Sequence, residues 1–64
     1  MPLVNIQLLE GRPENKIREL IKNVTDTVSE TVECPKERVR VVVEEIPKTH
    51  LGKGGVLASE ENDK

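Results

Sequence analysis

The sequence contains no Trp, Tyr or Phe, one cysteine and one histidine, and only 34% apolar residues in 64 positions. Without aromatic rings it lacks the platforms on which nucleic-acid bases stack, and with a net charge of −2 it presents no basic block for phosphates. Cys34 has no second cysteine to pair with, and Cys34 and His50 match no metal-site spacing. These absences argue against nucleic-acid binding, a disulfide scaffold and a metal centre.

Apolar runs are also short. No segment approaches the roughly 20 residues of a membrane-spanning helix, and no apolar signal-peptide stretch follows Met1. A lone thiol is typical of a reducing compartment. We therefore expect a cytoplasmic protein with no membrane partner.

The chain is predicted to be a single small domain over residues 1–64, with a mobile polar tail from about residue 60. Below about 70–80 residues a hydrophobic core rarely suffices without disulfides, a metal or oligomerisation. Since the sequence offers neither of the first two, oligomerisation is the expected source of stability.

The first two elements follow from hydrophobic spacing. Residues 2–9 alternate as in a strand, with Val4, Ile6 and Leu8 on one face. Residues 13–33 show spacings of three and four, which predict a long amphipathic helix. The apolar stripe consists of Ile17, Leu20, Ile21, Val24, Val28 and Val32. Pro13 suits the first helical turn, and Pro35 ends the helix.

A second strand is predicted over residues 38–46, followed by a glycine-rich turn, HLGKGG, and a short strand, VLA, that form a hairpin. The order indicates an α/β (α+β) fold, a small β-α-β unit with parallel strands plus a C-terminal hairpin. The helix covers only one face of the sheet. A second copy of the chain is the natural cover for the other face.

Three residues suggest chemistry. If Met1 is removed, Pro2 becomes a free secondary amine, and Arg40 lies near the start of the parallel second strand, at the same end of the sheet. Arg12 follows the far end of the first strand, up to roughly 30 Å from Pro2. If Arg12 acts together with Pro2, it must therefore come from another subunit.

An α-amino group has an ordinary pKa of about 8, and burial beside guanidinium groups would lower that pKa. Such a base transfers protons near neutral pH, and arginines bind carboxylates and stabilise enolate charge. The set suits a keto–enol tautomerase of an oxo acid or diacid. A structural interpretation stays open, since proline favours a strand start and surface arginines are commonly only solvated.

The stretches MPLVNIQLLEGR, VRVVVEE and HLGKGG, with the long helix between them, resemble the 4-oxalocrotonate tautomerase family over residues 1 to about 59. The resemblance implies that Pro2 is the general base. It implies that Arg12 holds the distal carboxylate of the substrate and that Arg40 binds the carboxylate and oxygen at the 2-oxo or 2-hydroxy end.

The same resemblance implies dimers of β-α-β units that assemble into a homohexamer, a trimer of dimers, with sites shared between subunits. It implies a small oxo- or hydroxy-acid substrate, such as 2-hydroxymuconate converted to 2-oxo-3-hexenedioate in aromatic hydrocarbon catabolism. No cofactor is implied, because the amine and the arginines suffice.

Within this resemblance, Leu51 stands where the characterised enzyme of the family has an aromatic residue that forms a hydrophobic wall near the proline. The fit of the substrate is therefore expected to differ. Two other functions remain open. Hydration or dehalogenation would need a carboxylate to activate water, whereas the glycine-rich turn offers Lys53. A non-catalytic oligomeric scaffold would follow if Met1 were retained, because an amide nitrogen cannot act as the base.

Overall fold

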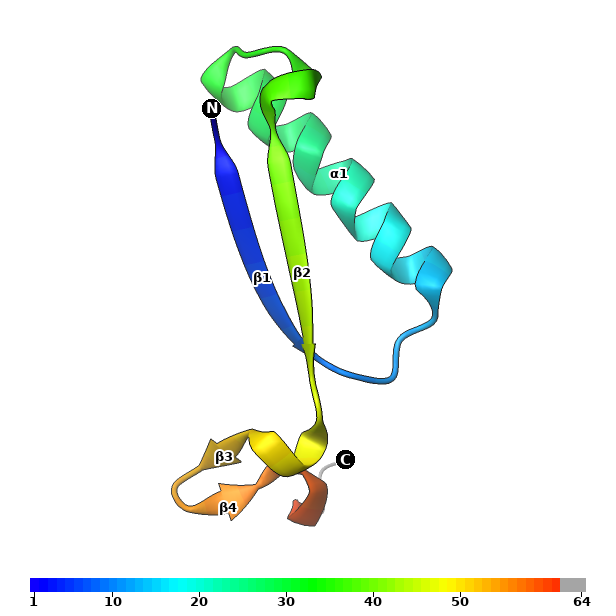
Figure 1. Cartoon of the computed structure of the whole chain (residues 1–64), viewed down its shortest axis with the longest axis vertical. Coiled ribbons are helices and arrows are strands. Elements are labelled where there is room, and N and C mark those ends of the chain that lie inside the picture. The colour runs from blue at the N-terminus through cyan, green and yellow to red at the C-terminus, as the bar shows by residue number, and fades with distance from the viewer. Residues whose placement is uncertain (62–64) are drawn as a thin grey trace.

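The structure of the chain, a computed structural model, describes residues 1–61. Residues 62–64, part of the predicted polar tail, lie outside the described residues. The main elements are β1 (Leu3–Leu9), α1 (Glu14–Val32), β2 (Arg40–Ile46), β3 (Gly52–Lys53) and β4 (Val56–Leu57). Three 3₁₀ turns join or follow them: η1 (Lys36–Arg38), η2 (Lys48–His50) and η3 (Ala58–Glu60). The predicted β-α-β unit with a C-terminal hairpin is confirmed (Figure 1).

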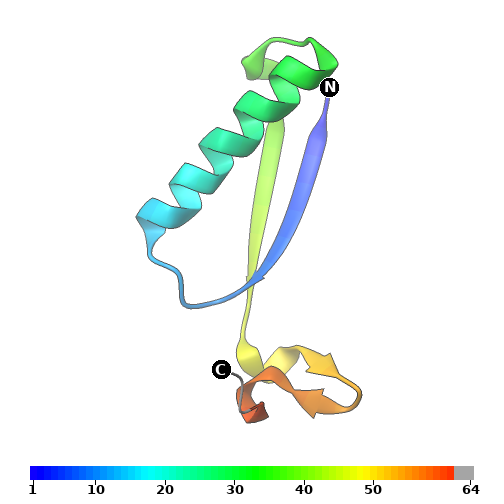
Figure 2. The same cartoon turned by 180° about the vertical axis from the view of Figure 1, so that it is seen from behind.

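The two long strands form a parallel ladder that runs from Leu3 opposite Arg40 to Leu9 opposite Ile46. The β3–β4 hairpin forms a separate antiparallel pair. Figure 1 and Figure 2 show that the hairpin lies beyond the carboxyl ends of β1 and β2, at the opposite end of the molecule from the N-terminus. The sheet therefore has a proline end, where Pro2 lies, and a hairpin end.

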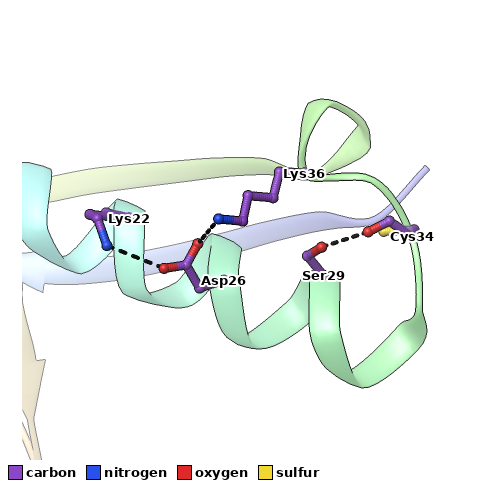
Figure 3. Close-up of polar contacts among 5 residues, drawn as sticks. All are labelled: Lys22, Asp26, Ser29, Cys34 and Lys36. Carbon is purple, nitrogen blue, oxygen red and sulfur yellow. Dashed lines mark hydrogen bonds and ion pairs between the residues drawn. The ribbon is translucent and has the colours of Figure 1, made fainter.

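The helix begins and ends one residue inside the predicted bounds. Pro13 is its N-cap, with an extended backbone, and its carbonyl accepts the N–H groups of Lys16 and Ile17 at 3.0 and 3.3 Å. At the other end, Glu33 adopts the left-handed conformation (φ 59°). The turn is held because the Ser29 hydroxyl donates to the Cys34 carbonyl at 2.6 Å (Figure 3).

The second strand begins later than predicted. The sequence predicts residue 38 in the strand, but Arg38 is the last residue of η1. The Arg38 backbone N–H donates to the Pro35 carbonyl at 3.0 Å. Pro35 has φ −63°, which is compatible with entry into a 3₁₀ turn. The extra turn delays the strand until Arg40.

One face of the sheet packs against α1 and the other stays open. Val4, Ile6 and Leu8 of β1 and Val41 and Val43 of β2 are half-buried, as their alternation predicts. On the opposite face, Leu3 is 62% exposed and Val42 is 49% exposed. Among residues 1–61 no side chain is fully buried. The α1-covered face is thus the nearest approach to a core in a single chain.

The dimensions of the chain also show that it lacks a compact core. Its radius of gyration is 14.8 Å, whereas a compact chain of this length has about 10.7 Å. Its accessible surface is 5266 Å², against about 4,100 Å² for a compact monomer of this mass. A single chain is therefore less compact, and exposes more surface, than a compact monomer of its size.

A carboxylate on α1 ties the helix to the turn that follows it. Asp26 pairs with Lys36 of η1 at 3.0 Å and with Lys22 at 3.3 Å (Figure 3). The hydrogen bond from Lys36, and then that from Lys22, hold the pKa of Asp26 below its ordinary value. The bond to Asp26 raises the pKa of Lys36.

This geometry predicts how stability responds to acid. Because the pKa of Asp26 is lower in the folded chain than in the unfolded chain, its contribution is present above the unfolded pKa and is lost as pH falls through the folded pKa. We expect Asp26→Asn to lower the free energy of unfolding at pH 7 and to make little difference at about pH 2. Urea unfolding at both pH values measures this.

The matched control is Glu19→Gln, which removes an exposed pair with Lys16 that lies within α1 at 3.6 Å. That change should be nearly neutral at both pH values, because exposed pairs contribute little. An Asp26→Asn effect of equal size at pH 7 and at low pH would contradict the assignment.

Candidate active site

Pro2 and Arg40 lie at the proline end of the sheet. The Arg40 backbone N–H donates to the Pro2 carbonyl at 3.0 Å, which extends the ladder one step beyond Leu3. The parallel strand order predicts this proximity. The backbone atoms of the two residues are therefore neighbours within one chain.

Their side chains nevertheless belong to different faces. Arg40 pairs with Leu3, so its exposed side chain shares the open face with that leucine. Pro2 precedes Leu3 and is half-buried like Val4, so alternation places its ring on the face that α1 covers. This separation was not predicted from the sequence, although the alternation of side chains along a strand implies it.

Met1 contacts the arginine directly. The Arg40 Nε–H donates to the Met1 Sδ at 2.9 Å on the open face. While Met1 is present, the nitrogen of Pro2 is an amide and the Arg40 guanidinium has a thioether against it. Removal of Met1 would therefore free the Pro2 nitrogen as an amine and expose the Arg40 guanidinium at the same time.

Arg12 lies at the hairpin end. Gly11 adopts φ 124°, which turns the chain out of β1, and the Arg12 Nη1 donates to the Leu9 carbonyl at 3.3 Å. Leu9 pairs with Ile46, the last step of the ladder. Seven steps of about 3.3 Å separate Pro2 from Leu9, so the Arg12 guanidinium, held at the Leu9 carbonyl, lies roughly 23 Å from Pro2. The guanidinium of Arg12 cannot reach Pro2 of the same chain.

Leu51 also lies at the hairpin end, between η2 and β3, and is 43% exposed. It lines a pocket of about 100 Å³ beside the end of β1. The other residues that line the pocket are Leu9, Gly52, Lys53, Val56, Ala58 and Glu61. The structure thus places Pro2 and Arg40 at one end of the sheet and Arg12 and Leu51 at the other.

The open face between the two ends carries a hollow of about 520 Å³. Asn5 and Gln7 of β1 and Val42 and Glu44 of β2 line it, and the Gln7 amide donates to the Glu44 carboxylate at 3.2 Å. No cluster of three or more His, Cys, Asp or Glu within residues 1–61 is placed to hold a metal ion. No helix in that range has the length and apolar character to cross a membrane.

Solved structures identify the class of the fold. A 4-oxalocrotonate tautomerase isozyme of Methylibium petroleiphilum superposes with a TM-score of 0.86 at 45% identity, covering 91% of this chain and 94% of that chain. A heterohexamer 4-oxalocrotonate tautomerase of Chloroflexus aurantiacus gives a TM-score of 0.88 at 32% identity, covering 94% and 97%. The chain therefore has the fold of 4-oxalocrotonate tautomerases.

Sequence comparison identifies the family. Residues 2–61 match the family described as Tautomerase enzyme, so the chain belongs to the tautomerase family. A probable tautomerase of Listeria innocua is 47% identical over 60 residues, covering 94% of this chain and 98% of that protein. The 2-hydroxymuconate tautomerase of Pseudomonas putida is 42% identical over 62 residues, covering 97% and 98%. This chain is a 4-oxalocrotonate tautomerase-like isomerase.

Proposed function

We propose that the protein, once Met1 is removed, converts 2-hydroxymuconate or a closely related 2-hydroxy diacid to its 2-oxo isomer. The observation that carries this proposal is the similarity, over nearly the whole length of both chains, to the Pseudomonas putida 2-hydroxymuconate tautomerase. The family match that begins at Pro2 supports it, because that residue would supply the amine.

In the proposed reaction, the amine nitrogen of Pro2 accepts the proton of the 2-hydroxyl group, which leaves a dienolate. The resulting ammonium then returns a proton to C5, so that the carbonyl forms at C2 and the remaining double bond lies at C3. The proton removed and the proton returned balance, and the product is an isomer. The reaction needs no oxidant, reductant or added group.

The two arginines bind opposite ends of the substrate. Arg40 binds the carboxylate and the oxygen at the 2-hydroxy end, where its bidentate donors stabilise the developing dienolate charge. Arg12 holds the distal carboxylate and draws electron density toward C5. Leu51 provides an apolar wall that keeps water from the amine.

Each site would combine residues from several copies of the chain. The roughly 23 Å between Pro2 and Arg12, and the opposite faces of Pro2 and Arg40, support this arrangement. The open face of the sheet and the surface in excess of a compact monomer support an oligomer. We propose a homohexamer, a trimer of dimers, in the cytoplasm, with residues 1–64 as one domain.

Ketonisation of 2-hydroxymuconate, followed by ultraviolet absorbance, tests the proposal, with phenylenolpyruvate as a monoacid run in parallel. The protein is checked by mass so that it begins at Pro2. We expect rapid turnover of the diacid. Slow turnover of both acids would contradict the proposed substrate, and no turnover of either by protein that begins at Pro2 would favour hydration, dehalogenation or a scaffold.

A further inference from the structure

The pocket at the hairpin end contains a charged group that the proposed function does not use. Apolar side chains, Leu9 and Leu51 among them, form most of its lining, and Lys53 adds a cationic side chain. At about 100 Å³ the pocket has room for one end of a small acid rather than for a whole substrate. Its chemistry, an apolar wall with a cation, suits a carboxylate on a short carbon chain.

The hairpin turn fixes where Lys53 lies. Lys53 ends β3 and pairs with Val56 of β4. Between them, Gly54 and Gly55 have φ values of 62° and 85°. Positive φ at both central residues is the pattern of a type I′ turn, whose twist matches that of the flanking strands. The lysine is therefore presented by a well-defined turn.

Leu9 links Arg12 to the pocket that Lys53 lines. Leu9 accepts the Arg12 Nη1 hydrogen bond through its carbonyl, and Leu9 also lines the pocket with Lys53. Within residues 1–61 the Lys53 ammonium forms no ion pair with a carboxylate. Glu61 lines the same pocket and opposes an incoming anion.

Building on the proposed function, we propose that Lys53 joins Arg12 in binding the distal carboxylate of a dicarboxylic substrate, and that it thereby selects diacids over monoacids. The guanidinium supplies a fork of donors, and the ammonium supplies a compact charge on a flexible stem. The aliphatic part of Lys53 adds to the Leu51 wall. Lys53 is then a specificity residue of the same site.

Calorimetric binding of two unreactive probes tests this inference. Muconate (hexa-2,4-dienedioate) and sorbate (hexa-2,4-dienoate) share a six-carbon diene and differ by the distal carboxylate. Lys53→Met keeps the apolar stem and removes the charge. We expect it to lower the muconate-to-sorbate affinity ratio about tenfold, as for the loss of one charge-assisted hydrogen bond. Lys53→Arg should restore most of the ratio.

Lys48→Met is the matched control, since Lys48 lies in η2 at the same end of the molecule and does not line the pocket. If attraction at long range were the cause, Lys48→Met and Lys53→Met would lower the ratio equally. Glu61→Gln should raise the ratio. An unchanged ratio in Lys53→Met, or an equal fall in both methionine variants, would overturn the inference.

Failure of this inference is distinguishable from failure of the proposed function. Neither probe carries the 2-hydroxyl group, so the affinity ratio does not depend on turnover. If wild-type protein converts 2-hydroxymuconate and the ratio is insensitive to Lys53, only the role of Lys53 is wrong. If the ratio responds to Lys53 and no conversion occurs, the diacid pocket stands and the proposed reaction is wrong.

Discussion

Replacing Pro2 with alanine is expected to lower kcat/KM for 2-hydroxymuconate by about 100-fold, the scale of a lost general base. Alanine still offers a terminal amine after Met1 removal, so some turnover should remain. The loss arises because a flexible primary amine replaces a secondary amine that the ring holds in place. Ketonisation rates measured on protein of verified mass provide the test.

Pro35→Ala is the matched control, because Pro35 is an exposed turn residue ahead of η1. It should retain nearly wild-type turnover. A second control adds residues before Met1, which keeps the Pro2 nitrogen as an amide and leaves Arg40 in contact with the Met1 sulfur. Turnover should be absent in that protein and return when cleavage exposes Pro2. A Pro2→Ala loss below about threefold would contradict the role of the base.

Replacing Arg12 with alanine is expected to separate diacids from monoacids. We predict that kcat/KM for 2-hydroxymuconate falls about 10- to 100-fold, as for the loss of charged hydrogen bonds to a carboxylate. Turnover of phenylenolpyruvate should fall far less, since it has no distal carboxylate. The ratio of the two kcat/KM values is the quantity to measure.

Arg18→Ala provides the control, because Arg18 is an exposed arginine of α1 that pairs with Glu14 at 3.2 Å. It should leave the ratio of the two substrates unchanged. Thermal unfolding checks that loss of the Arg12 bond to the Leu9 carbonyl does not destabilise the end of β1. Equal losses for diacid and monoacid would show that Arg12 does not hold the distal carboxylate.

Much of the fold could be predicted because its signals are local. The alternation of Val4, Ile6 and Leu8 gives the strand and its covered face, and the three-and-four spacing gives α1. The length of the helical crossover gives the parallel pairing. The boundaries were less predictable. The turn after Pro35 and the left-handed Glu33 depend on hydrogen bonds, such as that from Ser29 to Cys34, that periodicity does not report.

The site was predictable only in part, for a physical reason. Strand order gives the end of the sheet at which each residue lies, so Pro2 with Arg40 and Arg12 at the far end follow from sequence. The contact between Met1 and Arg40 depends on side-chain conformation. The pocket that joins Leu51 to Lys53 depends on how the hairpin folds back toward Leu9. Contacts between copies of the chain follow neither from strand order nor from the fold of a single chain.

The measurement that tests the account most directly is recovery of activity in a mixture of two variants of low activity. Pro2→Ala and Arg12→Ala proteins are unfolded together, refolded as mixed oligomers and assayed with 2-hydroxymuconate, beside each variant refolded alone. If each site takes Pro2 and Arg12 from different copies, an equal mixture restores about one wild-type site in four. Activity no higher than the mean of the separate variants would contradict a site shared between chains.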